Sequence, residues 1–328
     1  MHAWEGDPRL QATPDYGSFG PGTDLKPGRT VDPQMRGARF LAAVGAGVLM
    51  ALVVAAAQGG VARAAWSQIS DLLTLSGKPK AASPAILSGH EIESLDRESA
   101  QSQAQLLLER AVNHYQGAND QIAARVEGWR GKLQLTPQLN SLVTTALNSN
   151  DLRVRAAGIE VDLAAMGVAK TPASVDGLAQ EAEASGHPQR VWALWTLGLL
   201  GNRGIEPERI AQILIAQLRD SDPEIRHWAV EGLAYLGTDA TIVPLLQVFH
   251  DDESPMVRER AACSLAQSGM LSQEQRHRAL PQLLNYTEDA SLDAQTRSWV
   301  YQALRDITGQ NLPNDPGAWR TWYGSNQN

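Results

Sequence analysis

Apolar residues recur at intervals of three and four positions from residue 99 almost to the end of the chain, which is the spacing of one face of an α-helix. Within residues 99–135 this pattern is interrupted at residues 117–120, where glycine, asparagine and aspartate are typical of a turn. These residues therefore predict a helical hairpin, with Asn119 or Asp120 as the N-cap of its second helix.

Five later segments share one pattern: an acidic or turn residue, an apolar residue, an arginine, a small residue and a closing glycine. They are residues 151–167, 187–201, 222–237, 254–269 and 293–309. Their arginines, Arg155, Arg190, Arg226, Arg258 and Arg297, are separated by 35, 36, 32 and 39 residues. Such a period fits two helices of about 12–15 residues joined by short turns. The partner helices are predicted at residues 136–148, 174–184, 206–219, 240–250 and 272–286.

One helix pair cannot bury its own apolar face, so successive pairs are expected to stack. The sequence therefore predicts an all-α fold, an α-solenoid of five repeats over residues 136–309 that follows the hairpin of residues 99–135. The closing glycines Gly167, Gly201, Gly237 and Gly269 are expected to end their helices in the left-handed conformation, which glycine adopts at little cost.

The N-terminal third has a different composition. Residues 1–38 are rich in glycine, proline and aspartate without an apolar period, which predicts a disordered tail. Residues 40–62 contain no charged side chain, and 23 helical residues are long enough to cross a bilayer. We expect a single transmembrane helix at residues 39–62, followed by a linker at residues 63–98. The alternative is the core of a signal peptide that is cleaved near Ala64.

Basic residues are concentrated before this segment, at Lys26, Arg29, Arg36 and Arg39, and only Arg63 follows closely. Because positive charge stays on the cytoplasmic side, we expect a cytoplasmic N-terminus and an extracytoplasmic repeat domain at the inner membrane. Cleavage would instead release the repeat domain into the periplasm.

The repeat segments resemble HEAT repeats, in particular the short HEAT-like repeats named after the phycobilisome lyases. Asp222-Pro-Glu-Ile-Arg226, followed by Ala229 and Leu233, is the best match. The resemblance implies a scaffold fold and pairing of the repeated acids and arginines between neighbouring repeats. The acids are Asp151, Asp222 and Asp293, and they would pair with Arg155, Arg226, Arg258 or Arg297, while Arg190 is the equivalent arginine of the remaining repeat. The alternative is a row of arginines that binds carboxylates of a ligand.

Aromatic residues give two further candidates for partner binding. Trp192, Trp228 and Trp299 occupy the same repeat position, where tryptophan can pack between repeats or bind a peptide. In the C-terminal segment, residues 310–328, Trp319 and Trp322 can cover the last repeat or form a docking helix.

Composition narrows the possible chemistry. A formal net charge of −8 disfavours nucleic-acid binding, and one cysteine excludes an intramolecular disulfide. The seven histidines lack metal-binding spacing, and no phosphate-binding loop or nucleophile motif occurs. We therefore expect no catalytic residue, cofactor or metal.

The expected function is a non-enzymatic scaffold that is tethered to the bilayer by residues 40–62 and binds protein partners through its solenoid surface. The resemblance leaves open chromophore attachment of the phycobilisome-lyase type or a chaperone role. A structural role in the cell envelope is a third alternative.

Overall fold

A computed structural model describes residues 85–184 and 186–326, which belong to one compact unit. Within these ranges the structure is helical, apart from an isolated parallel bridge between Ile86 and Gln116, so the predicted all-helical fold is confirmed for this part of the chain. No helix in these ranges has the length and apolar character needed to span a bilayer. The predicted tail (1–38), membrane segment (39–62) and first part of the linker (63–84) lie outside the described residues.

The first described helices precede the repeats. Residues 85–98 were predicted as part of the linker, but they contain helix α3 (Gly89–Leu95). The helix forms because Ser88 and Glu91 make a capping box and Leu95 is buried. Helices α4 (Ala100–Val112) and α5 (Ala118–Trp129) form the predicted hairpin. The N-cap of α5 is neither Asn119 nor Asp120 but Gly117, whose φ of 86° suits a residue without a side chain.

Five helical units follow, which we number as repeats 1 to 5. They are α6 (Pro137–Leu147) with α7 (Leu152–Ala165), α8 (Pro172–Ala182) with α9 (His187–Asn202), α10 (Pro207–Gln217) with α11 (Pro223–Leu236), α12 (Ile242–Asp251) with α13 (Pro255–Ala266), and α14 (Gln273–His277) and α15 (Leu280–Tyr286) with α16 (Ala294–Thr308). A 3-10 turn, η1 (Asp239–Thr241), leads into α12, and α17 (Pro316–Ser325) ends the described chain.

The first helix of repeat 5 differs from its prediction. Residues 272–286 were expected to form one helix, but α14 ends at His277 and α15 begins at Leu280 with Pro281 in its first turn. Proline lacks an N–H group and clashes with the preceding turn, so a continuous helix is not possible here.

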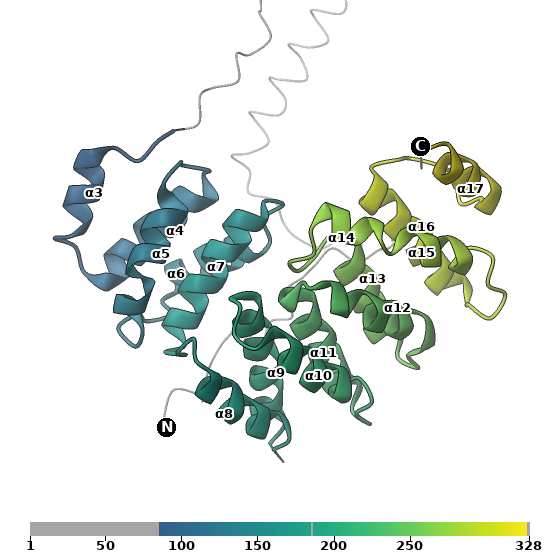
Figure 1. The fold of residues 1–328 in the computed structure, drawn as a ribbon, viewed down its shortest axis with the longest axis horizontal. Helices are drawn as coiled ribbons and strands as arrows, with labels where there is room; N and C mark the ends of the chain where they lie inside the picture. The colour runs from purple at the N-terminus through teal and green to yellow at the C-terminus, as the bar shows by residue number, and fades with distance from the viewer. Residues whose placement is uncertain (1–84, 185, 327–328) are drawn as a thin grey trace, which may run out of the picture. The chain divides into compact units, whose positions relative to one another are not determined.

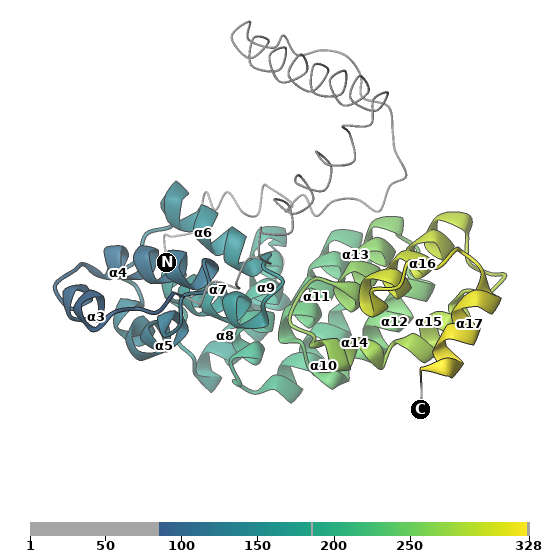
Figure 2. The same cartoon turned by 90° about the horizontal axis from the view of Figure 1, so that it is seen from above.

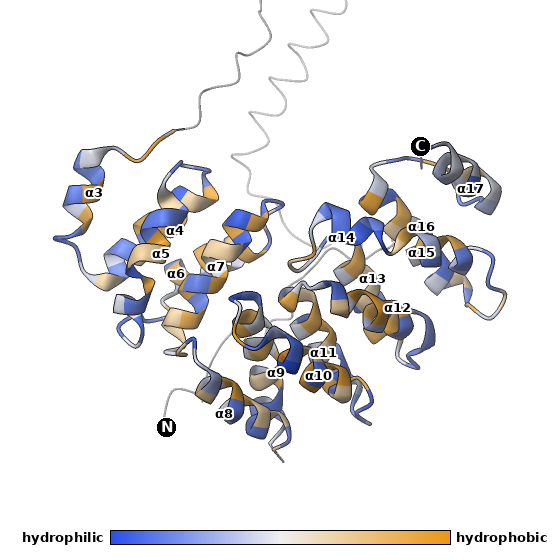
Figure 3. Cartoon of the chain, viewed as in Figure 1, coloured by the Kyte–Doolittle hydropathy of each residue, from blue (hydrophilic) through white to orange (hydrophobic). Residues whose placement is uncertain are grey.

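The repeats are joined mainly through their second helices. Helix α9 packs against α11, α11 against α13, and α13 against α16, while each first helix packs on the second helix of its own repeat. Figures 1 and 2 show the helices following one another in chain order along this stack. In Figure 3 the helices carry both hydrophobic and hydrophilic positions, as the apolar period requires.

The tightest interface is the crossing of α9 and α11, where two glycines meet. A Cβ atom on Gly198 would lie 2.4 Å from the carbonyl oxygen of Gly232, and one on Gly232 would lie 2.6 Å from that of Leu194. Both positions therefore require glycine so that the two backbones can approach each other.

Closing glycines were predicted at four helix ends, and three of them have the left-handed conformation. The φ angles of Gly167, Gly237 and Gly269 are 71°, 63° and 72°. Gly201 differs because α9 continues to Asn202, and the left-handed residue after it is Gly204, with a φ of 83°. At Gly201 a Cβ atom would lie 2.4 Å from the Leu236 side chain, so this glycine serves helix packing.

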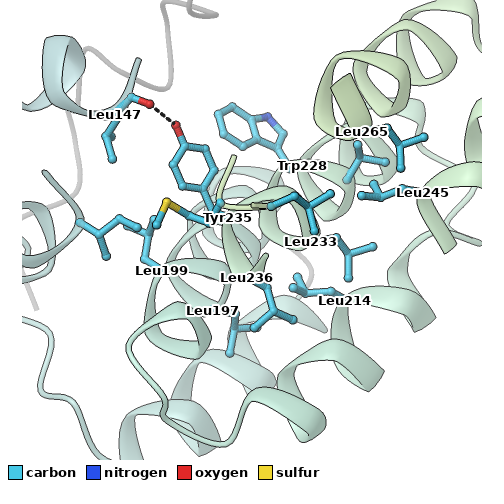
Figure 4. Close-up of a cluster of buried hydrophobic side chains, with 14 of the residues drawn as sticks. Leu147, Leu197, Leu199, Leu214, Trp228, Leu233, Tyr235, Leu236, Leu245 and Leu265 are labelled. Atoms are coloured by element: carbon cyan, nitrogen blue, oxygen red, sulfur yellow. Dashed lines mark hydrogen bonds between the residues drawn. The ribbon is translucent and has the colours of Figure 1, made fainter. Parts of the chain in front are cut away.

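Buried leucines fill the space between the helices of repeats 2 and 3. Figure 4 shows Leu197, Leu214, Leu233 and Leu236 in this core, all of them at most 1% exposed. At the edge of the cluster the buried Tyr235 of α11 donates a hydrogen bond of 3.3 Å to the carbonyl oxygen of Leu147, at the end of α6. Repeat 3 thus contacts repeat 1 directly.

Candidate functional site

Arginines at the equivalent repeat position connect neighbouring repeats through ion pairs. Arg226 binds both carboxylate oxygens of Asp252, with Nε–Oδ2 and Nη2–Oδ1 distances of 2.8 and 2.9 Å. Arg258 binds Asp293 at 2.9 Å, and Arg190 binds Asp220. These pairs join repeat 2 to 3, 3 to 4 and 4 to 5. The hydrogen bonds from Arg226 to Asp252 also raise the pKa of this guanidinium above its usual value.

The same guanidinium groups also satisfy carbonyl groups in the loop that precedes their own helix. Arg226 donates to the carbonyl of Asp220 at 2.9 Å, and Arg258 donates to that of Asp252 at 2.7 Å. In repeat 5, Arg297 donates to the carbonyls of Asp289 and Leu292 at 3.0 and 2.9 Å. These arginines therefore order the loops of their own repeats.

Two predicted acids have a different role from the one expected. Asp151 and Asp222 were expected to pair with repeat arginines, but each caps the helix that it precedes. Asp151 forms an ion pair with the neighbouring Arg153 at 3.0 Å, and Asp222 lies 3.3 Å from His187.

Asp220 and Asp252, the acids that do bind Arg190 and Arg226, stand two residues before the N-caps of α11 and α13. Each accepts a hydrogen bond of 2.8 Å from the N–H of the N-cap residue. This geometry is an Asx turn, which holds the carboxylate next to the arginine of the preceding repeat. An acidic residue at that position in both loops is a sequence signal that could have identified these partners.

Arg155 binds a distant part of the chain. It is 5% exposed and donates hydrogen bonds to the carbonyls of Ser149, Gly269 and, at 2.9 Å, Gln267. Its contacts with residues 267 and 269 connect repeat 1 to the end of α13 in repeat 4.

A second buried arginine lies at the same helix end. Arg276 donates to the carbonyls of Ser264, Leu265 and Ser268 at 2.8–3.0 Å. Burial, together with the nearby charge of Arg155, lowers the pKa of Arg276 to about 10. Cations are favourable here because the last carbonyls of a helix lack intrahelical donors and carry partial negative charge.

The three equivalent tryptophans do not form an exposed row. Trp228 and Trp299 are buried, at 8% and 3% exposure, and Trp192 is half-buried. Trp195 was not singled out in the sequence, yet it makes edge-to-face contacts with Trp228 and Tyr235 at centroid distances of 6.2 and 4.6 Å. The aromatic side chains in this region contribute to packing between α9 and α11.

Arg260, which takes the tryptophan position in repeat 4, forms a buried ion pair with Glu231 of α11. The single cysteine, Cys263, lies one turn further along α13, and burial raises its pKa to about 12. Because a thiol is nucleophilic as the thiolate, this cysteine is poorly suited to covalent chemistry near neutral pH.

The C-terminal aromatic residues cover the last repeat. Trp319 is fully buried and its indole N–H donates to the carbonyl of Pro313 at 2.9 Å. Trp322 is half-buried against it, with ring centroids 6.0 Å apart. Helix α17 packs on α15, and Arg320 binds both oxygens of Glu288 at 2.7 Å.

An open groove of about 620 Å³ lies between the first helices of repeats 3 and 4. Its lining includes Ile215 of α10, Leu218 directly after this helix, and Pro244 and Val248 of α12. The ends of these helices, the adjoining loops and α11 supply charged residues of both signs, which are Arg219, Asp220, Arg226, Asp251, Asp252 and Glu253. The described residues contain no group of three or more histidine, cysteine, aspartate or glutamate side chains that could hold a metal ion.

The stacked hairpins define the class of the described region as an α-solenoid. The family model for HEAT repeats matches residues 175–266 and 211–305, which lie within repeats 2 to 5. No curated protein sequence matches the chain. A crystal structure of an engineered protein from the Northeast Structural Genomics Consortium aligns with 67% of this chain and 97% of its own, at 16% identity and a TM-score of 0.31. A likeness that low carries no argument about function.

Proposed function

We propose that the protein is a non-enzymatic HEAT-repeat scaffold that binds protein partners through the surface of its solenoid. The observation that carries this proposal is that the repeat side chains are used for contacts within the fold, whereas one groove is left open. Arg190, Arg226 and Arg258 bind acids of the next repeat, and two of the three equivalent tryptophans are buried in the packed helices. The groove between α10 and α12, in contrast, remains open beside this framework.

The scaffold is held at the inner membrane by residues 40–62, with the repeats on the extracytoplasmic side. This part of the proposal is supported by the uncharged run of 23 residues and by the basic residues that precede it. Fractionation combined with sequencing of the mature N-terminus tests it. The intact chain is expected in the membrane pellet, and a soluble periplasmic chain that begins near Ala65 would contradict the anchor.

Cross-linking in intact cells, followed by purification in detergent and mass spectrometry, tests partner binding. We expect the full chain to give reproducible cross-links between residues of α6–α16 and one partner protein. The control is a fusion in which residues 1–84 of this chain precede an unrelated domain, and it should not give these cross-links. If cross-links occur only within the chain itself, the scaffold function is wrong.

A further inference from the structure

We infer that the groove between α10 and α12 binds an extended peptide segment in which an apolar side chain stands next to a lysine or arginine. The inference rests on the proposed scaffold function and specifies where a partner binds. The apolar walls of the groove come mainly from the first helices of repeats 3 and 4, and its rim includes Asp220, Arg226 and Asp252, which take part in the ion pairs described above.

The groove exists because neighbouring first helices separate in this part of the solenoid. Helices α10 and α12 pack extensively on α11 and α13, respectively, and no comparable packing joins α10 to α12 in the described chain. The resulting space of about 620 Å³ is within the range of about 300–1,000 Å³ that is typical of ligand sites. Ile215, Leu218 and Val248 give it apolar walls that can receive an apolar side chain.

The charges that line the groove favour a partner with positive charge. Four carboxylates and two guanidinium groups line it, so acidic groups are in excess. Asp252 is occupied by Arg226 and Asp220 by Arg190. The side chain of Asp251 is 71% exposed, and His250 contacts its Oδ1, which leaves Oδ2 for a ligand.

Glu253 adds a second accessible carboxylate. It is exposed, and its side chain makes no ion pair with any described residue. Asp251 and Glu253 can therefore each bind a cationic side chain at the rim of the groove. Arg219, also exposed and without an ion pair among the described residues, can donate to the carbonyl groups of the bound peptide. In an extended segment with alternating apolar and basic residues, the apolar side chains can contact the walls of the groove. The basic side chains can then bind the carboxylates of Asp251 and Glu253 at its rim.

Fluorescence anisotropy with the full chain in detergent tests this site. The probe is a fluorescein-labelled octapeptide in which leucine and lysine alternate, and the matched peptide has glutamate in place of lysine. We expect the lysine peptide to bind and the glutamate peptide not to bind. Binding should weaken as salt rises from about 0.05 M to about 0.5 M, because the contacts at the rim are screened.

Two independent variants locate the binding. Neutralising the rim with D251N/E253Q is expected to weaken binding about fivefold, as two exposed ion pairs are lost. Its matched control is E98Q/E109Q, which removes two exposed carboxylates from the α3–α4 region. Filling the groove with Q247W should abolish binding without changing charge, whereas V243W, on the same helix but outside the groove lining, should bind normally. Circular dichroism confirms that each variant is folded.

Normal binding to D251N/E253Q and Q247W, or equal binding of the glutamate peptide, would overturn the assignment. A synthetic peptide of residues 25–40 of this chain that competes for the groove with higher affinity than the lysine probe would assign it to an internal segment and would also overturn it. Peptide binding in the groove without partner cross-links in cells would reject the scaffold function alone. Partner cross-links that persist in Q247W cells would reject the groove alone.

Discussion

At the scale of single residues, Arg226 joins two repeats through a carboxylate that is almost completely shielded from water. The side-chain exposures of Arg226 and Asp252 are 13% and 5%. The variant R226M leaves this carboxylate without its cation, and we expect the free energy of unfolding to fall by about 2–4 kcal/mol. Urea denaturation monitored by circular dichroism measures the change.

The control for Arg226 is Arg153, whose side chain is 82% exposed in its ion pair with Asp151. Because exposed ion pairs contribute little, R153M should change stability by less than about 1 kcal/mol. Equal losses in the two variants would show that shielding of Asp252 does not determine the strength of the contact.

His250 introduces a dependence on pH at the junction of repeats 4 and 5. Its Nε2 lies 2.9 Å from Asp289, and its Nδ1 contacts Asp251. Burial lowers the pKa of His250, but the hydrogen bonds to Asp251 and Asp289 outweigh it, so the pKa is raised above 6.5. The stabilisation is therefore fully present below the unfolded pKa of about 6.5 and is lost as the pH rises through the higher folded value.

Thermal melts between about pH 5.5 and about pH 8.5 test this prediction, since that interval brackets the titration. We expect the melting temperature of the native chain to exceed that of H250Q most at the acidic end, with the difference shrinking as the pH rises. H277Q is the control because His277 makes no ion pair among the described residues. A difference that grows with pH would contradict the raised pKa.

At the scale of helices, the crossing of α9 and α11 depends on the absence of side chains at Gly198 and Gly232. In G198A the new methyl group would meet backbone atoms of Gly232, which cannot move away as a flexible side chain could. We expect a loss of about 1–3 kcal/mol in unfolding free energy from this overpacking. Denaturant titration is again the measurement.

G177A provides a matched comparison within a helix. Gly177 lies in α8, and a Cβ atom there would have no neighbour within 4 Å. Alanine has the higher helix propensity, so this variant should be stabilised by about 0.5–1 kcal/mol. Opposite signs for the two glycine variants support the close approach, whereas two stabilising substitutions would contradict it.

The helices were predictable because their signals are local. The apolar period, the capping residues and the spacing of the arginines located the repeats, and a proline explains the one helix that is divided. The contacts between helices were harder to predict from the sequence. Gly201 has the sequence context of a helix end but serves packing against Leu236, and the partner of Arg226 depends on an Asx turn in the next repeat. The groove between α10 and α12 depends on the separation of two helices, which the sequence of neither one specifies.

At the scale of the whole described region, Arg155 connects parts of the chain that are more than a hundred residues apart. Its hydrogen bonds to the carbonyls of Gln267 and Gly269 span 112 and 114 residues. The variant R155M removes these bonds and leaves buried carbonyls with fewer donors, which we expect to cost about 2–4 kcal/mol. A nearest-neighbour solenoid would show this loss only around repeat 1.

Hydrogen exchange distinguishes a local effect from a distant one. In R155M, protection should fall both at the start of α7 and at the end of α13, which are separated in sequence but joined by this side chain. In R297M, whose donor contacts stay within repeat 5, the loss should be confined to that repeat. If α13 keeps its full protection in R155M, the connection between repeats 1 and 4 is not important for stability.

The connection made by Arg155 also determines how many units the chain can hold. Repeats 2 and 3 lie between its two ends, and with these two units the carbonyls of residues 267 and 269 stand beside the guanidinium of a side chain in repeat 1. Inserting a duplicated unit or deleting one would carry the end of α13 away from Arg155 and leave its guanidinium without two of its carbonyl partners. The number of repeats in this domain is therefore coupled to one side chain. Gain or loss of an internal repeat would need a simultaneous change at position 155.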